Sequence, residues 1–159
     1  MKKESIDVTD EGFQKILLTN VTAVFSLSRE VVGCMLKKNI MGSIINISLM
    51  ASQYGIPKVI AYTASKSAIE GMTRAMTVDL SPKGICVNCI APGFIATDMS
   101  AKALNNDPER RNKVLSRTLM GVVGQPSDIG DAAVFLATDA SKYITGIVLP
   151  VDGGNSIGF

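Results

Sequence analysis

Three short apolar segments, separated by stretches with helical periodicity, constrain the fold more than any other feature of this 159-residue sequence. They span residues 43–47, 85–90 and 146–151, and the loops around them contain glycine or proline. Continuous apolar runs of this length are typical of strands buried on both faces, and helices between such strands imply parallel crossovers. The sequence therefore predicts an α/β fold, specifically part of a doubly wound, Rossmann-like parallel sheet.

The predicted helices account for most of the remaining chain. The longest covers residues 9–38, where apolar residues recur at three- and four-residue intervals. Asn20 falls on this apolar stripe, and because an unpaired buried amide costs about 1–3 kcal/mol, we expect it to have partners. Further helices are predicted over 61–81 and 127–138. We interpret residues 1–159 as a single domain.

Composition and charge exclude several classes of function. The chain has no histidine, which excludes Ser–His–Asp and Cys–His catalysis and His-ligated metals. The net charge of +2 argues against nucleic-acid partners, and the short apolar runs predict neither a membrane span nor a signal peptide. Cys86 and Cys89 have C-x-x-C spacing but lie in a predicted strand, so we interpret them as core residues and expect no metal. A cytoplasmic location follows as the expectation.

One pair of residues carries the strongest chemical signal. Tyr62 and Lys66 stand four positions apart on a predicted helix and so lie on one helix face. A free phenol has a pKa of about 10, and a nearby ammonium favours the phenolate and lowers that pKa. In a chain without histidine this is the best available acid–base pair, although the same spacing also occurs by chance on helix surfaces.

Five motifs in a fixed order set this pair in context. Together they resemble the short-chain dehydrogenase/reductase family, and most closely its 3-oxoacyl-[acyl-carrier-protein] reductase and gluconate 5-dehydrogenase type members. The resemblance covers nearly the whole chain. The motifs are Asn20, Asn46-Ile47-Ser48, Tyr62 with Lys66, residues 87–97 ending in Pro92-Gly93-Phe94-Ile95-Ala96-Thr97, and Val151-Asp152-Gly153-Gly154.

The resemblance implies a role for each matching residue. Tyr62 matches the tyrosine that transfers the proton, and Lys66 the lysine that lowers its pKa and binds the nicotinamide ribose. Asn20 matches an asparagine that holds a water linked to the lysine, and residues 99–117 match a mobile flap over the substrate. The resemblance thus implies hydride transfer between NAD or NADP and a carbonyl or alcohol substrate. The implied cofactor contacts are Tyr62, Lys66, Pro92, Gly93, Ile95 and Thr97.

Two departures from the family pattern limit this expectation. The family's catalytic serine corresponds here to Leu49, which cannot polarise a carbonyl, and loss of one such donor typically costs about 10²–10³ in rate. A local bulge would let Ser48 or Ser52 substitute, so Ser48 stays a candidate catalytic residue. The chain also has no glycine-rich strand–turn–helix unit, which the resemblance places before Met1. Dinucleotide binding is therefore expected to be weak, and the choice between NAD and NADP stays open.

Two hypotheses follow from these features. The first is an oxidoreductase of the short-chain dehydrogenase/reductase type that acts on a small carbonyl or alcohol compound. The alternative is a catalytically silent protein that acts only through its oligomerisation surfaces, which the resemblance places on the helices 9–38 and 61–80 and on the C-terminal strand. Both hypotheses predict a homo-oligomer, either a dimer or a tetramer, without nucleic-acid or membrane partners.

Overall fold

The computed structural model describes residues 3–98, 100, 104 and 106–158 and contains a parallel sheet. Its three strands are β1 (Gly42–Ile47), β2 (Ile85–Pro92) and β3 (Val148–Val151), in the order β1-β2-β3. Both strand pairs are parallel. The predicted α/β class with a parallel sheet is therefore confirmed.

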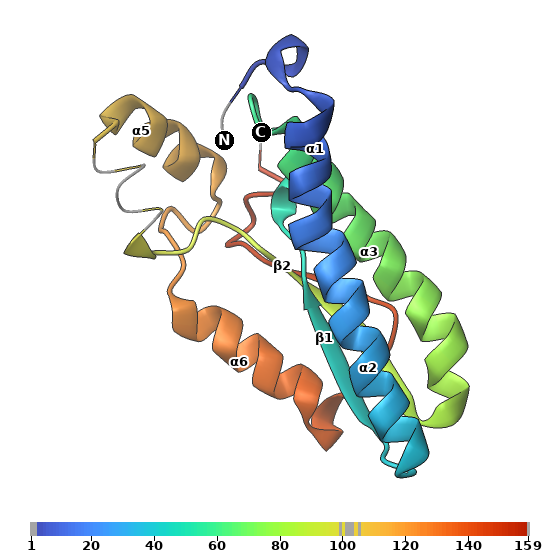
Figure 1. Cartoon of the computed structure of the whole chain (residues 1–159). Coiled ribbons are helices and arrows are strands. Elements are labelled where there is room, and N and C mark those ends of the chain that lie inside the picture. The colour runs from blue at the N-terminus through green and yellow to red at the C-terminus, as the bar shows by residue number, and fades with distance from the viewer. Residues whose placement is uncertain (1–2, 99, 101–103, 105, 159) are drawn as a thin grey trace.

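Helices cover both faces of this sheet (Figure 1). On one face lie α3 (Ile60–Leu80) and, beside it, α1 (Asp10–Leu17) and α2 (Ala23–Lys37). The other face is covered by α6 (Pro126–Ala137), which contacts all three strands. A shorter helix, α5 (Pro108–Arg117), stands away from the sheet beyond the strand ends.

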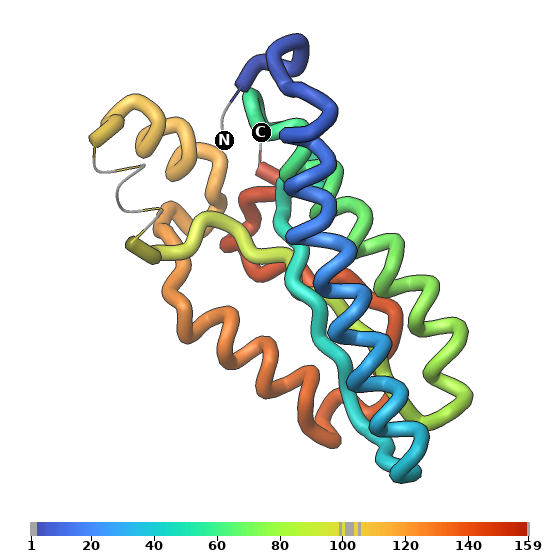
Figure 2. The backbone as a smooth tube through the Cα atoms, in the orientation of Figure 1, coloured from blue at the N-terminus to red at the C-terminus, as the bar shows by residue number. Residues whose placement is uncertain are grey.

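The first helix is not the regular span that the periodicity over 9–38 predicts. A π-helical turn, Leu18–Thr22, separates α1 from α2, and Asn20 lies at its centre. Figure 2 shows that the chain nevertheless runs on in one direction alongside α3. Single π turns within α-helices often mark functional positions, because they rotate one side chain out of the regular helical register. In this chain the π turn shifts the helical register at Asn20, whose side-chain amide we expected to be hydrogen-bonded.

Two strand ends differ from their predicted positions. The break expected after residue 90 is wrong, because β2 continues to Pro92, which lies opposite Val151 of β3. Proline is tolerated there because the ladder with β1 has already ended two residues earlier. The third strand begins at Val148 and not at residue 146, because Gly146 has a φ of +82° and is therefore outside the extended region.

The core lies between β2 and the helices α2 and α3. Leu80, Ile85 and Val87 form a buried cluster against which side chains of α2, α3 and β1 pack. Buried polar groups in this region are paired: Asn46 Nδ2 donates to Thr73 Oγ1 at 2.9 Å. Along most of its length β2 is buried on both faces, which explains its continuous apolar sequence.

One helical span is long and apolar enough to cross a membrane by length and composition. It runs from Asp10 to Lys37, has a mean hydropathy of 1.2 in its most apolar window, and only 6% of that window is buried within the chain. The expectation of no span rested on uninterrupted apolar runs, which this helix lacks because Arg29 and Glu30 interrupt it. One such helix is weak evidence for a membrane, because core helices and signal sequences can have the same length and composition.

Candidate active site

A cleft of about 620 Å³ opens where β1 and β2 end. Its wall is formed by residues from both strands, the first turns of α3, the segment after β2, α5 and α6. Ligand sites in open parallel sheets characteristically lie beyond the carboxyl ends of the strands. The lining residues are Ile47, Ser48, Leu49, Tyr62, Lys66, Pro92, Gly93, Phe94, Ile95, Thr97, Ser100, Leu104, Arg110, Pro126 and Ile129.

Tyr62 and Lys66 both line this cleft, on the face of α3 that the four-residue spacing predicts. Lys66 Nζ lies 5.6 Å from the centroid of the Tyr62 ring and donates a hydrogen bond to the Ile47 carbonyl oxygen at 3.0 Å. Tyr62 is 38% exposed, so its ring forms part of the open wall. The Ile47 carbonyl at the end of β1 therefore orients the Lys66 ammonium, and the position of Tyr62 on α3 directs its phenol to the same cleft.

Burial shifts the pKa values of both groups toward their neutral forms. Desolvation raises the pKa of the Tyr62 phenol above its usual value. Desolvation also lowers the pKa of the Lys66 ammonium, with a smaller opposing influence from the Cys89 sulfur. The sequence led us to expect that the Lys66 ammonium lowers the pKa of Tyr62, but burial shifts this pKa upward.

Asn20 reaches the site through another side chain and does not line the cleft itself. Its Nδ2 donates to Ser65 Oγ at 3.0 Å, and Ser65 Oγ in turn donates to the Tyr62 carbonyl oxygen at 2.7 Å. The π turn thus ties the first helix to the turn of α3 that carries Tyr62 and Lys66. Ser65 was not predicted; its position between those two residues was the available signal.

Ser48 lines the cleft, and its hydroxyl is hydrogen-bonded within the chain. The residue is 2% exposed, and its Oγ donates to Glu70 Oε1 at 3.0 Å. Ser52 also donates to Glu70, so one carboxylate holds both hydroxyls that could replace the missing serine. A hydroxyl has a single proton to donate, and in this arrangement both hydroxyls have acceptors within the chain. Leu49 adds an apolar side chain to the wall at this point.

The segment after β2 forms the wall that the resemblance assigns to the nicotinamide. The expected contacts Pro92, Gly93, Ile95 and Thr97 all line the cleft. Gly93 is required by packing, because an added Cβ would lie 2.6 Å from Asp152 Cα. The Thr97 N–H and hydroxyl both pair with the Ser100 hydroxyl. Residues 99, 101–103 and 105 of the predicted flap lie outside the described part of the chain.

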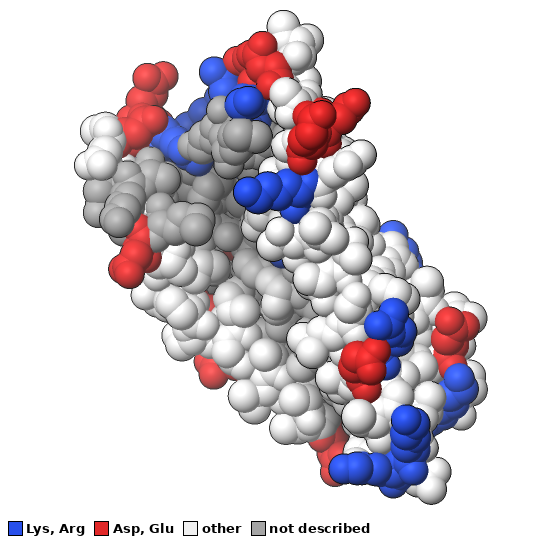
Figure 3. All heavy atoms as spheres, viewed as in Figure 1, with Lys and Arg blue, Asp and Glu red and all other residues white. Residues whose placement is uncertain are grey.

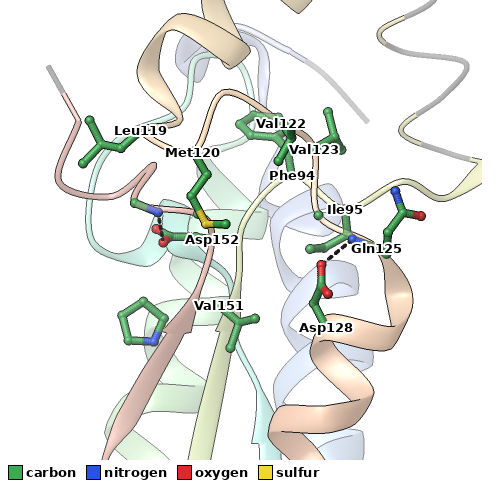
Figure 4. A pocket seen from close by; sticks show the side chains of 14 residues that line it. Phe94, Ile95, Leu119, Met120, Val122, Val123, Gln125, Asp128, Val151 and Asp152 are labelled. Atoms are coloured by element: carbon green, nitrogen blue, oxygen red, sulfur yellow. Dashed lines mark hydrogen bonds between the residues drawn. The ribbon is translucent and has the colours of Figure 1, made fainter.

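A second and larger cavity, of about 790 Å³, lies on the other side of Phe94 and Ile95 (Figure 4). It is mostly apolar, and its only acidic side chains are Asp128 and Asp152. Asp128 Oδ2 accepts from the Gln125 N–H at 2.7 Å, and the two oxygens of Asp152 accept from backbone N–H groups of the C-terminal turn. Because both carboxylates are held in this way, proton transfer is better supported by the smaller cleft.

Comparison with known proteins decides the family. A family model described as enoyl-(acyl carrier protein) reductase matches residues 1–156. The 3-oxoacyl-[acyl-carrier-protein] reductase of Chlamydia trachomatis is 42% identical over 147 residues, which cover 92% of this chain and 58% of that protein. The chain belongs to the short-chain dehydrogenase/reductase family.

Other members of the family agree with this assignment. The 2-dehydro-3-deoxy-D-gluconate 5-dehydrogenase of Bacillus subtilis is 40% identical over 96% of this chain and 59% of that protein. A solved structure of a putative 2-deoxy-D-gluconate 3-dehydrogenase from Agrobacterium tumefaciens, with bound NADP, superimposes with a TM-score of 0.94 at 34% identity. It is matched over 98% of this chain and 63% of its own. The chain thus spans about 60% of the length of these relatives.

Proposed function

We propose that this chain carries the proton-transfer half of an NAD(P)-dependent oxidoreductase site that interconverts a carbonyl and an alcohol. The observation that supports this most directly is the placement of Tyr62 and Lys66 on one cleft with the Pro92-Gly93 turn. No other cavity described above combines a free proton donor with a cation. The family relationship adds the reaction type, because its named members are reductases and dehydrogenases.

The residues present fit the nicotinamide end of such a cofactor. Pro92 and Gly93 form one wall of the cleft and bring no charged side chain of their own to it, and Lys66 keeps ammonium donors beyond the one bonded to Ile47. Tyr62, Ile95 and Thr97 would complete the contacts. When bound, the cofactor supplies or accepts the hydride. The described residues contain no glycine-rich strand-to-helix turn for the pyrophosphate, so we expect NAD and NADP alike to bind this chain weakly.

The proton chemistry belongs to Tyr62. In the direction of reduction its hydroxyl donates the proton to the carbonyl oxygen, because it is the only titratable O–H donor in the cleft wall as described. Lys66 provides a positive charge beside the ring that stabilises the phenolate left behind. Leu49 contributes no hydrogen bond to the same oxygen, so turnover is expected to be slow.

Measured hydride transfer tests this proposal. The purified chain is incubated with NADH or NADPH and small aldehydes and ketones, and cofactor oxidation is followed by fluorescence. We expect slow turnover that Tyr62→Phe reduces about 10²–10⁴-fold, with Lys66→Met also impaired. Tyr143→Phe is the matched control, since Tyr143 is fully exposed and far along the chain from the cleft. Equal rates for Tyr62→Phe and the parent chain would contradict the proposal.

A second proposed function, self-association without catalysis, is favoured by the exposed surface. The chain has an accessible surface of 9755 Å², whereas a folded monomer of 16.8 kDa is expected to expose about 7,700 Å². The excess of about 2,000 Å² is as large as a stable protein interface. We expect a homo-oligomer in the cytoplasm, where the three free cysteines stay reduced. A monomer in sedimentation at tens of micromolar would contradict it.

A further inference from the structure

An arginine lines the proposed catalytic cleft, although nothing in the sequence distinguishes it from its neighbours. Arg110 is the third residue of α5, and it is half-buried. The start of α5 is well defined, because Pro108 occupies the first position and the Arg110 N–H donates to Asp107 Oδ1 at 2.9 Å. Helix geometry therefore turns Arg110 into the cleft, while the adjacent Arg111 is exposed.

The charged side chains along the described wall of the cleft are all positive. Lys66 and Arg110 are its only ionised side chains, and no carboxylate is among the described residues that form its wall. Lys66 already donates to the Ile47 carbonyl oxygen, whereas no ion pair or side-chain hydrogen bond of Arg110 is found in the described part of the chain. Asp107, three residues before Arg110, is not part of this wall and caps the helix by accepting from the Arg110 backbone N–H. A guanidinium in a largely apolar wall is best satisfied by an anion from outside.

We propose that Arg110 is a specificity-determining residue that binds a carboxylate of the substrate, so that the cleft selects small oxo acids or hydroxy acids over neutral carbonyl compounds. The planar guanidinium presents two parallel N–H donors that match a carboxylate. This inference rests on the proposed function, because it places the reacting carbon at Tyr62 and the acid group at α5 within one cleft of about 620 Å³.

Ligand binding to the full chain, followed by amide NMR shifts, tests the inference without requiring turnover. The probes are two matched pairs that differ in charge: D-gluconate with D-glucitol, and acetoacetate with its methyl ester. We expect the parent chain to prefer the acid of each pair. Arg110→Gln should weaken binding of the acids by about ten- to a hundredfold and leave the neutral probes unchanged. Arg110→Lys should recover part of the loss.

The control variant is Arg111→Gln, which removes the same charge from an exposed position of the same helix and should change nothing. A cofactor phosphate is the other possible source of the anion. Titration with NADPH and with the phosphate-free reduced nicotinamide riboside distinguishes this source. The inference is overturned if Arg110→Gln weakens NADPH binding selectively, if acids and neutral probes bind equally, or if none binds. If the chain transfers no hydride but binds acids through Arg110, the proposed function fails and this site stands.

Discussion

The strand β2 and the helical span α1–α2 are both apolar, but the chain buries only one of them. From Val87 to Ala91, every residue of β2 except Asn88 is apolar, and all five are completely buried. The span from Asp10 to Lys37 buries a single residue, Ser28, and exposes large side chains such as Leu18, Phe25 and Leu27. Figure 3 shows that uncharged side chains cover most of the surface over these helices.

The difference separates the region that the chain encloses by itself from the region that we propose self-association covers. The strand is enclosed by β1, β3, α3 and α6, and its buried Asn88 is paired with the Ile144 carbonyl oxygen and the Ile147 N–H. Within the described chain, the helical span packs along one side, against α3 and the core cluster of Leu80, Ile85 and Val87. The candidate cleft lies where the enclosed part ends, so the proposed proton-transfer residues are carried by this enclosed region.

Truncation of one side chain in each region gives the largest contrast in stability. Ile90→Ala, in the enclosed strand, should reduce the free energy of unfolding by about 2–5 kcal/mol, because it leaves a cavity. Leu27→Ala, at a position that is 67% exposed, should change it by less than about 0.5 kcal/mol in the monomer. Urea denaturation at low concentration measures both. Similar losses for the two variants would remove the distinction between the regions.

Restoring the missing donor tests the site at the edge of the enclosed region. Leu49→Ser should raise the rate of carbonyl reduction by one to three orders of magnitude, the scale of one oxyanion-type hydrogen bond. The reason is that Ser48 and Ser52 both donate to Glu70 and leave the substrate oxygen with Tyr62 alone. Steady-state kinetics decides, with Leu49→Ala as the control for side-chain size. An unchanged rate would show that another hydroxyl already fills this position.

A charge on the exposed helical span should disrupt association without unfolding the chain. Leu27→Asp should weaken self-association by about tenfold, since roughly 1.4 kcal/mol is lost when one apolar contact is replaced by a desolvated carboxylate. Ile6→Asp, at another exposed position that lies outside the span, serves as the control. Sedimentation over a concentration series measures the change. An association constant that is the same in both variants would place the interface elsewhere.

The smallest expected effect is a change in the stability of the chain with pH, through the Cys89 thiol. Burial raises the pKa of the Cys89 thiol above its usual 9.0, with weaker opposing hydrogen bonds from Ser48. A raised pKa means that the folded state favours the neutral thiol. The contribution of Cys89 to the free energy of unfolding is therefore complete below about pH 9, and it is lost as the pH rises through the pKa of the thiol in the folded chain. Stability should therefore fall as the pH rises above about 9. In Cys89→Ala this decline should be shallower, and an identical slope in urea denaturation would contradict the assignment.

The parts of the site that the sequence predicted depend on local geometry. Tyr62 and Lys66 share a wall because residues four apart on a helix share a face, and Pro92 and Gly93 lie at the end of a recognisable strand. The parts that it missed depend on distant contacts. Glu70 captures the Ser48 hydroxyl across 22 residues, and Arg110 enters the cleft only because α5 folds over the strand ends. The π turn at Asn20 was missed as well, because apolar periodicity does not reveal one extra residue in a turn.

Isotope transfer tests the central claim, that Tyr62 and Lys66 form the proton-transfer pair of a hydride-transfer site. The chain is incubated with NADPH deuterated at C4 of the nicotinamide and a small oxo acid, and the product is analysed by mass spectrometry. We predict deuterium on the new carbinol carbon, with the rate of labelling reduced at least about a hundredfold in Tyr62→Phe and unchanged in Tyr143→Phe. Labelling that proceeds equally in Tyr62→Phe, or no labelling in any chain, would contradict the account.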